Sequence, residues 1–254
     1  MADNPLDGKV VLVTGASRGI GAAIAEECAA RGAAVAVNYR RSEEPAQRLV
    51  EALRDRGGRA VAVCADVTDA AAVTEMAAAV DRELGPPDVL VLNAHGFDES
   101  VRGFPLDIDV DALTGVVADQ LRAALLPVQA IVPGMIERGR GHVIFISAIV
   151  SRDPWRRSLT HASAKAAMEI IPKILSRTVA DAGVRINTVL VGVTKTDATD
   201  QIPPDKLALA LQQIPMGRMG RPDEVARAVA MLASDDTSYI TGAFLPVCGG
   251  ALVL

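Results

Sequence analysis

Three glycines, at positions 15, 19 and 21, follow an apolar run over residues 9–13 and lead into an amphipathic run over residues 20–31. A strand, a glycine loop and a helix in this order let the backbone turn sharply and bring the free N–H groups of the helix start close to a bound anion. A phosphate is the natural ligand, although a tight strand-to-helix turn alone is the alternative. The loop residues predicted to bind a cofactor are Gly15, Ser17, Arg18, Gly19, Ile20 and Gly21.

The end of the second predicted strand indicates which nucleotide binds. In a dinucleotide-binding fold an acid about 20 residues after the glycines accepts hydrogen bonds from the ribose hydroxyls of NAD. This chain has Asn38 there, followed by Arg40 and Arg41, and no acid. Guanidinium groups can pair with a 2′-phosphate, so the sequence predicts NADP(H) and assigns Asn38, Arg40 and Arg41 to its site. The alternative is that Arg40 and Arg41 form a solvated turn.

These residues need a framework of alternating strands and helices. Strands are predicted over residues 9–13, 33–38, 60–65, 88–93, 142–147, 184–191 and 243–247. Helices are predicted over residues 20–31, 43–56, 70–84, 109–138, 159–181, 203–213 and 222–233. Continuous Val, Ile, Leu and Ala runs in the strands indicate a parallel sheet that is covered on both faces. We therefore expect one α/β domain over residues 1–254, a doubly wound Rossmann-type sheet of seven strands with ligands at their carboxyl ends.

Composition narrows the function classes. Half of the 254 residues are apolar, the formal net charge is −5, and no Lys/Arg run exceeds a pair, so neither nucleic acid nor an acidic membrane is an expected partner. The N-terminus lacks a signal pattern, and we expect a soluble, cytoplasmic chain. The cysteines at 28, 64 and 248 fit reduced core thiols, and the three histidines show no metal-ligand spacing, so no metal is expected.

Four motifs together resemble those of classical short-chain dehydrogenase/reductases, closest to the 3-oxoacyl-carrier-protein reductase-like branch. They are the loop at 14–21, Ala65-Asp66-Val67, Asn93-Ala94-His95-Gly96 and the stretch at 216–250, and the resemblance covers essentially the whole chain. It implies a homotetramer or dimer and a small-molecule substrate. It also implies further cofactor-binding positions, namely Asp66, Val67, Asn93, Ala94, Gly96, Lys165, Thr194 and Thr196.

The family reduces carbonyls with a Tyr-x-x-x-Lys pair, a Ser about thirteen residues earlier and an Asn on the long preceding helix. The Tyr donates a proton, the Lys lowers the pKa of the Tyr and holds the ribose, the Ser orients the carbonyl, and the Asn holds a water. Matching by position retains Lys165 but places His161 at the Tyr, Ala148 at the Ser and Gln120 at the Asn. Ser147 adjoins Ala148, yet neighbouring strand residues point to opposite faces.

His161 is the candidate replacement for the phenol. An imidazolium is a stronger acid, but a helix N-terminus and Lys165 favour the neutral ring, which leaves His161 as acid, base or filler. The substrate wall is predicted to include Phe97, Arg152 and Trp155, the last as a ring platform or a loop anchor.

Three functions are compatible with these patterns. The first is an NADP(H)-dependent oxidoreductase that reduces a carbonyl, imine or activated C=C bond without the usual Ser/Tyr pair. The second is a non-redox enzyme on the same scaffold, with His161 as a base for hydration, dehydration, epoxide opening or cyclisation. The third is a catalytically silent subunit in a mixed oligomer with an active relative. The sequence favours the first, largely by analogy of fold.

Overall fold

A parallel sheet of seven strands forms the centre of the chain in a computed structural model that describes residues 4–95, 101, 104–155, 158–200 and 204–254. The strand order is β3-β2-β1-β4-β5-β6-β7, and every described pairing is parallel. The strands are β1 Val10–Val13, β2 Ala34–Tyr39, β3 Ala60–Cys64, β4 Val89–Leu92, β5 Gly141–Ala148, β6 Val184–Val191 and β7 Phe244–Val247. This order confirms the predicted doubly wound Rossmann-type fold.

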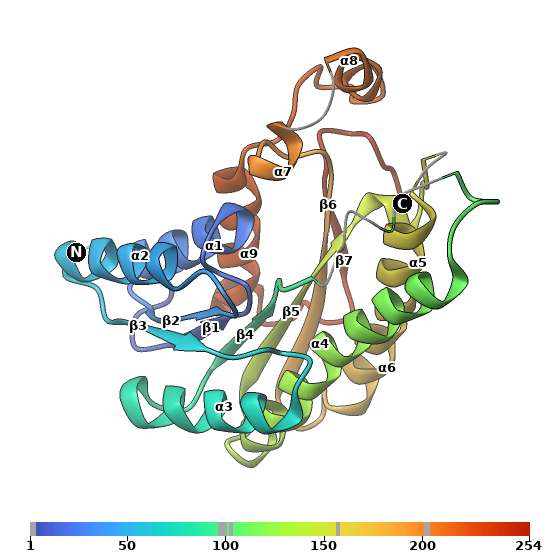
Figure 1. Cartoon of the computed structure of the whole chain (residues 1–254). Helices are drawn as coiled ribbons and strands as arrows, with labels where there is room; N and C mark the ends of the chain where they lie inside the picture. Colours follow the sequence, from blue (N-terminus) through green and yellow to red (C-terminus); the bar gives the residue numbers. More distant parts are fainter. Residues whose placement is uncertain (1–3, 96–100, 102–103, 156–157, 201–203) are drawn as a thin grey trace.

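Helices cover both faces of the sheet. Their bounds are α1 Gly19–Ala30, α2 Glu43–Asp55, α3 Ala70–Leu84, α4 Val110–Glu137, α5 Leu159–Met168, α6 Ile170–Thr178, α7 Asp197–Asp200, α8 Pro204–Gln212 and α9 Pro222–Ala233, with short 3-10 turns at Ile149–Ser151 and Asp235–Thr237. Figure 1 shows α1, α2 and α9 on one face and α3, α4, α5 and α6 on the other. Two separate apolar clusters of buried residues fill these two layers, so each face has its own core.

The helix predicted over residues 159–181 is instead two helices that part at Glu169. Pro172 explains the break, because proline has no N–H to donate to the carbonyl four residues earlier, that of Met168. The prolines at 127 and 133 do not divide α4. By length and mean hydropathy α4 could cross a membrane, but nine of its residues are buried in the fold, and a single helix of this kind is weak evidence for a membrane span.

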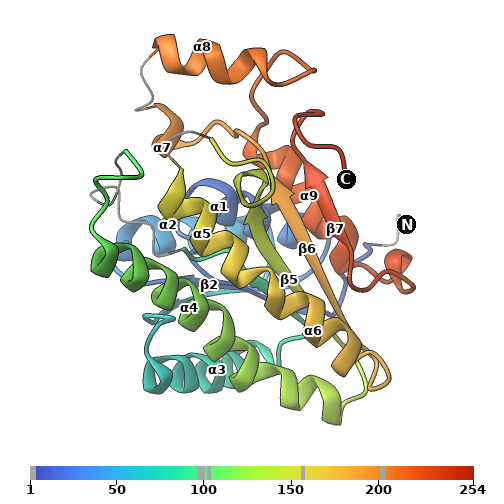
Figure 2. The ribbon, with the colours of Figure 1, turned by 90° about the vertical axis from the view of Figure 1, so that its right-hand side faces the viewer.

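Strand order reverses between β1 and β4, which lie side by side although α1, β2, α2, β3 and α3 separate them in sequence. The loops that follow the two strands therefore diverge to opposite sides of the sheet and leave a crevice for a ligand. Helices α7 and α8, which follow β6, lie beyond the carboxyl ends of the strands (Figure 2). The fold thus gathers the loops after β1, β4, β5 and β6 at one end.

One prediction about the cysteines is wrong. Cys28 is buried and Cys248 is half-buried, but Cys64 is exposed. Cys64 is the last residue of β3, an edge strand, where an apolar run is not covered on every side.

Candidate functional site

The glycine loop follows β1 and lies very close to its neighbours, because its glycines have no side chain. A Cβ at Gly15 would lie 3.0 Å from the Cα of Ala94, and one at Gly21 would lie 2.5 Å from the carbonyl oxygen of Gly15. Gly15 and Gly19 have φ values of 63° and 59°, in the left-handed region that favours glycine. The loop therefore exposes backbone to a ligand where larger residues would fill the space.

A hydrogen-bond network ties this loop to the end of β4. The Asn93 side chain donates from Nδ2 to the carbonyl oxygens of Thr14 and Gly15, at 3.0 Å each. The Thr14 hydroxyl accepts from the backbone N–H groups of Asn93 and Ala94, also at 3.0 Å. Asn93 and Ala94 thus support the loop from the neighbouring strand, and the first N–H groups of α1 point outward as an anion site.

Asn38 has a different position from the one predicted for a cofactor ligand. Its residue is 2% exposed, its Oδ1 accepts from the N–H of Gly15 at 3.1 Å, and its Nδ2 donates to backbone carbonyls that include that of Ala65 at 3.1 Å. The side chain makes these hydrogen bonds inside the protein, because a buried amide needs hydrogen-bond partners there. Asn38 therefore shapes the loop from below rather than facing the ligand.

The arginines predicted to bind a 2′-phosphate lie at the surface next to this loop. Arg18, Arg40 and Arg41 are exposed. Arg40 donates from Nη1 to Oδ2 of Asp66 at 3.3 Å, and Thr68 donates from its N–H and its hydroxyl to Oδ1 of Asp66. Burial raises the pKa of Asp66, but the hydrogen bonds from Thr68 and the charge of Arg40 outweigh this and lower it overall.

Of the two predicted threonines after β6, Thr196 lies next to the glycine loop. The methyl group of Thr196 would lie 3.6 Å from a Cβ at Gly19, so these two residues are neighbours. Thr194 is buried and forms a bridge to Gly220, and its hydroxyl donates to the carbonyl oxygen of Gly192 at 3.1 Å. The structure therefore brings Gly19, after β1, and Thr196, after β6, together.

Val67, a predicted cofactor-binding residue that follows β3, is buried at 7% exposure.

Lys165 is buried at the carboxyl end of the sheet. Its Nζ donates to the carbonyl oxygen of Ile146 in β5 at 3.0 Å, and the residue is 4% exposed. Burial lowers the pKa of Lys165 to about 8, and the negative charge of Glu169 opposes this shift. Lys165 is therefore a buried hydrogen-bond donor that is charged below about pH 8 and loses its charge above it.

The residues that the sequence pattern predicts at the Tyr, Asn and Ser positions lie in different settings. His161 is half-buried in the first turn of α5, one helical turn before Lys165. Gln120 is 3% exposed and donates from Nε2 to Sδ of Met168 at 3.4 Å, so α4 and α5 are in contact there. Ala148 is half-buried at the end of β5. Of the four positions, only those of Lys165 and His161 carry side chains of ordinary proton-transfer chemistry.

Sequence reasoning missed a polar cluster around Glu169. Its buried carboxylate accepts from the Ser147 hydroxyl at 2.7 Å and from Nε of Arg152 at 2.7 Å, and the Ser151 hydroxyl also contacts it. Arg152, predicted to face the substrate, thus turns toward Glu169, and this is a correction. The sequence feature that could have revealed this cluster is an acid, four residues after Lys165, in the apolar run Met168-Glu-Ile-Ile171.

His95 is a second residue that the sequence did not assign to the site. Surrounding protein atoms and the positive charges of Lys165 and Arg18 lower the pKa of His95 to about 4. The residue is nevertheless exposed, so solvent screens these charges and reduces the shift. The position of His95 directly after Asn93-Ala94 is the sequence feature that could have assigned it to the site.

The predicted substrate wall is partly described. A cavity of ≈170 Å³ is lined by Trp155 and Asp153 of the loop after β5, by Val193 after β6, and by residues from α8 to Ile214, with Ile149 and Ala251 completing it. Trp155 is 46% exposed, and its carbonyl accepts from the Ser158 hydroxyl at 2.8 Å. Gly96 and Phe97 lie outside the described residues.

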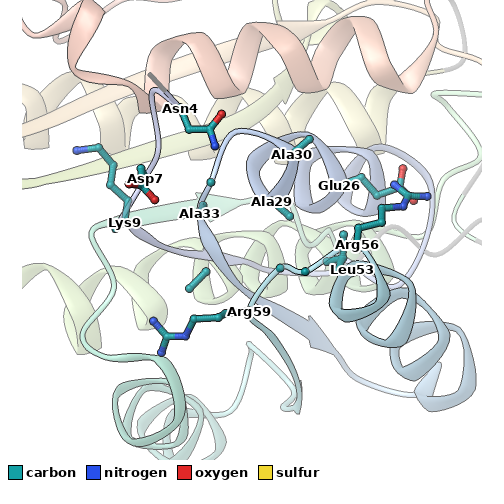
Figure 3. Close-up of a pocket in the computed structure, with 15 residues that line it drawn as sticks. Asn4, Asp7, Lys9, Glu26, Ala29, Ala30, Ala33, Leu53, Arg56 and Arg59 are labelled. Carbon is teal, nitrogen blue, oxygen red and sulfur yellow. The ribbon is translucent and has the colours of Figure 1, made fainter. Parts of the chain in front are cut away.

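A larger hollow of ≈490 Å³ opens at the other end of the sheet. Its lining comes from the amino ends of β1 and β2 and the carboxyl ends of α1 and α2 (Figure 3). Lys9 on its wall is paired with Asp235 at 2.9 Å, and Arg59 donates to the carbonyl oxygen of Leu84 at 3.3 Å. These cations are already occupied, and the hollow lies opposite the glycine loop.

Among the described residues, no group of three or more His, Cys, Asp or Glu side chains could hold a metal ion. The donors gathered at the carboxyl end of the sheet are instead backbone N–H groups, guanidinium groups, Lys165 and hydroxyls. The glycine loop leaves the space that a pyrophosphate requires, so the residues fit a dinucleotide. Fold and site together define a nucleotide-binding α/β protein.

Comparison with known proteins identifies the family. A family model described as "Enoyl-(Acyl carrier protein) reductase" matches residues 15–251. The chain is 35% identical to 2,5-dichloro-2,5-cyclohexadiene-1,4-diol dehydrogenase of Sphingobium indicum, over 97% of each chain. It is 36% identical to the 3-oxoacyl-[acyl-carrier-protein] reductase of Escherichia coli, over 96% of this chain and 97% of that one. The chain belongs to the short-chain dehydrogenase/reductase family.

A third relative and a solved structure agree with this assignment. The chain is 37% identical to 3beta-hydroxysteroid dehydrogenase 1 of Eggerthella lenta, over 96% of this chain and 94% of that one. A double mutant of a Serratia marcescens short-chain dehydrogenase/reductase superposes with a TM-score of 0.88 at 33% identity, over 97% of this chain and 99% of that chain. These relatives are dehydrogenases and reductases, so the general class is oxidoreductase with a nicotinamide cofactor.

Proposed function

We propose that this chain is an NADP(H)-dependent oxidoreductase that reduces a small-molecule carbonyl, imine or activated C=C bond without a Ser/Tyr pair. The observation that carries the proposal is the buried Lys165, bonded to the Ile146 carbonyl oxygen, with His161 one turn away where the family has its phenol. The glycine loop and its supports are complete, whereas Gln120, Ala148 and His161 differ from the family pattern. We infer an intact cofactor site with altered proton chemistry.

The arginines support the choice of NADP(H) over NAD(H). Arg18, Arg40 and Arg41 are exposed beside the loop, and the residue at the end of β2 where the ribose hydroxyls of NAD would meet an acid is Asn38. The Arg40–Asp66 pair is 50% and 36% exposed at the side chains, and exposed pairs contribute little stability, so Arg40 can turn to a phosphate at low cost. Thr194, Thr196, Asn93 and the loop N–H groups complete the proposed cofactor contacts.

The chemistry divides between cofactor and protein. The nicotinamide supplies a hydride when it is bound. Lys165 holds the ribose, and the loop after β5 and α8 line the small cavity beside Trp155, where a substrate can be held against the cofactor. His161 donates or accepts a proton, and a substrate that is already a protonated imine needs only this limited help. The names of the three relatives refer to three different kinds of substrate, so they do not indicate the substrate of this chain.

A non-redox reaction on the same scaffold is the second candidate. It is favoured by two histidines at the carboxyl end of the sheet, because His95 follows β4 directly after Asn93-Ala94 and His161 lies in the first turn of α5. A base and an acid at one site suit hydration or dehydration. Turnover that is indifferent to NADPH and lost in His161→Ala would establish it, whereas turnover coupled to NADPH oxidation would exclude it.

We further propose a homo-oligomer located in the cytoplasm. The outer side of α6 carries Ile170 and Ile174 at 54% and 58% exposure, and because they are four residues apart they form one apolar face that a second copy can cover. Light scattering coupled to size-exclusion chromatography tests the oligomer: a dimer or tetramer of identical chains is expected. Co-purification with a second, different reductase chain would instead support a catalytically silent subunit.

A further inference from the structure

Glu169 is a buried carboxylate that ties two parts of the site together. Its residue is 3% exposed, and its oxygens accept from Ser147 Oγ and from Arg152 Nε at 2.7 Å each, with Ser151 Oγ in contact as well. A carboxylate is tolerated in the interior only when it is hydrogen-bonded and paired. The donors that surround Glu169 meet both conditions.

All of these donors come from one stretch of chain. Ser147 ends the buried part of β5, and Ser151 and Arg152 lie in the segment that leads to Trp155. The Arg152 guanidinium also lies 4.9 Å from the ring centroid of Phe244. The carboxylate therefore attaches the cavity wall after β5 to the junction between α5 and α6.

The same residue is linked to Lys165. The N–H of Glu169 donates to the carbonyl oxygen of Lys165 at 3.0 Å, which places the two side chains one helical turn apart. Lys165 Nζ donates a hydrogen bond to the carbonyl oxygen of Ile146, and the Glu169 carboxylate accepts one from Ser147 Oγ. The two charged groups are therefore hydrogen-bonded to adjacent residues of β5. The negative charge of Glu169 opposes the effect of burial on the pKa of Lys165.

Other charged or titratable groups face this pair from the elements around it. His161 lies one turn before Lys165 on α5, and His95 comes from the loop after β4 and interacts with the Lys165 charge. Arg152 faces Glu169 from the segment after β5. Glu169 supplies a negative charge among these groups.

We propose that Glu169 is a positioning residue that provides a negative charge one helical turn from Lys165 and holds the segment from Ile149 to Arg152 against the body of the site. It does so from inside the fold, without contact with substrate or cofactor. The use of Lys165 as a ribose anchor rests on the proposed function, but the coupling of Glu169 to Lys165 and to the segment is a property of the free protein.

The first test measures the titration of Lys165 directly. The chain is labelled with 13C at the ε carbon of lysine and titrated by NMR without cofactor, and the Lys165 signal is identified by its loss in Lys165→Met. In Glu169→Gln the midpoint is expected to fall by about one pH unit or more, the usual effect of removing a nearby opposite charge. Glu137→Gln, an exposed acid at the end of α4, is the control and leaves the midpoint unchanged.

A second variant keeps the proposal testable if Glu169→Gln does not fold. Arg152→Gln leaves the carboxylate without its cation, so the Lys165 midpoint is expected to rise. The segment itself is monitored through Trp155, the only tryptophan of the chain, whose quenching by acrylamide is expected to increase in both variants. Unchanged Lys165 midpoints in the folded variants, or a Trp155 that stays equally protected, would overturn the proposal.

Both measurements are made on the free protein, so they separate this proposal from the proposed function. A chain that never oxidises NADPH can still show the shifted Lys165 midpoint, and then only the proposed reaction fails. A chain that oxidises NADPH but shows no shift in either variant refutes the role of Glu169 alone.

Discussion

Replacement of Gly21 by alanine tests how the glycine loop is built. The added methyl carbon would lie 2.5 Å from the carbonyl oxygen of Gly15, 2.6 Å from Nδ2 of Asn93 and 2.9 Å from Cα of Ala16. Two of these neighbours are backbone atoms, and Asn93 is fixed by two hydrogen bonds of 3.0 Å to the loop. None of the three can move without opening the loop.

The cost of Gly21→Ala follows from these contacts. Overpacking of a tight site costs about 1–3 kcal/mol. Loss of the two Asn93 hydrogen bonds costs about 0.5–1.5 kcal/mol each. The free energy of unfolding is therefore expected to fall by about 2–6 kcal/mol, which lowers Tm by at least about 4 °C in a chain of this length.

The matched control is Gly115→Ala. Gly115 lies in α4, and a Cβ there would meet no atom within 4 Å. Alanine is the better helix former by up to about 1 kcal/mol, so Tm is expected to stay or to rise. Thermal unfolding followed by circular dichroism, together with titration of NADPH, measures both variants. A Gly21→Ala protein with the Tm and NADPH affinity of the unmodified chain would refute the reasoning.

The remaining predictions concern charge and proton transfer. Arg40→Ala is expected to weaken NADPH binding about ten- to hundredfold, as loss of a hydrogen bond to a charged group does, and to leave NADH binding unchanged in a calorimetric titration. NADPH affinity is expected to decline as pH rises through about 8, because Lys165 is charged only below its lowered pKa; Lys165→Met should bind weakly with no such pH dependence in the same titration. The pair His161→Tyr and Ala148→Ser is expected to create or raise carbonyl reduction in a steady-state assay, and no gain would indicate that substrate lies differently from the family pose.

Most of the framework was predictable because it depends on local patterns. The runs of Val, Ile and Leu predicted every strand to within about two residues, and α3 and α9 were predicted with their observed bounds. The division of the last long helix at Glu169 was not predicted, because the effect of Pro172 depends on which carbonyl lacks its partner. The exposure of Cys64 depends on β3 being an edge strand, which is a property of strand order.

The site was predictable in its positions but not in its contacts. Spacing located Gly15, Gly21 and Lys165, since each belongs to a motif of fixed length. It could not show that Asn38 turns inward to hold the loop, or that Arg152 reaches back to Glu169, because both depend on side-chain direction across chain segments far apart in sequence. Glu169 itself belongs to no motif, and only the packing of β5 against the α5–α6 junction reveals it.

Oxidation of NADPH is the most direct measurement of the proposed reaction. The protein, saturated with NADPH, is mixed with a panel containing a carbonyl, an imine and an activated enone, and the loss of the reduced nicotinamide signal is followed in time. We expect oxidation with at least one substrate class, dependent on His161 and faster with NADPH than with NADH. Tight binding of NADPH with no oxidation across the whole panel would contradict the proposed reductase.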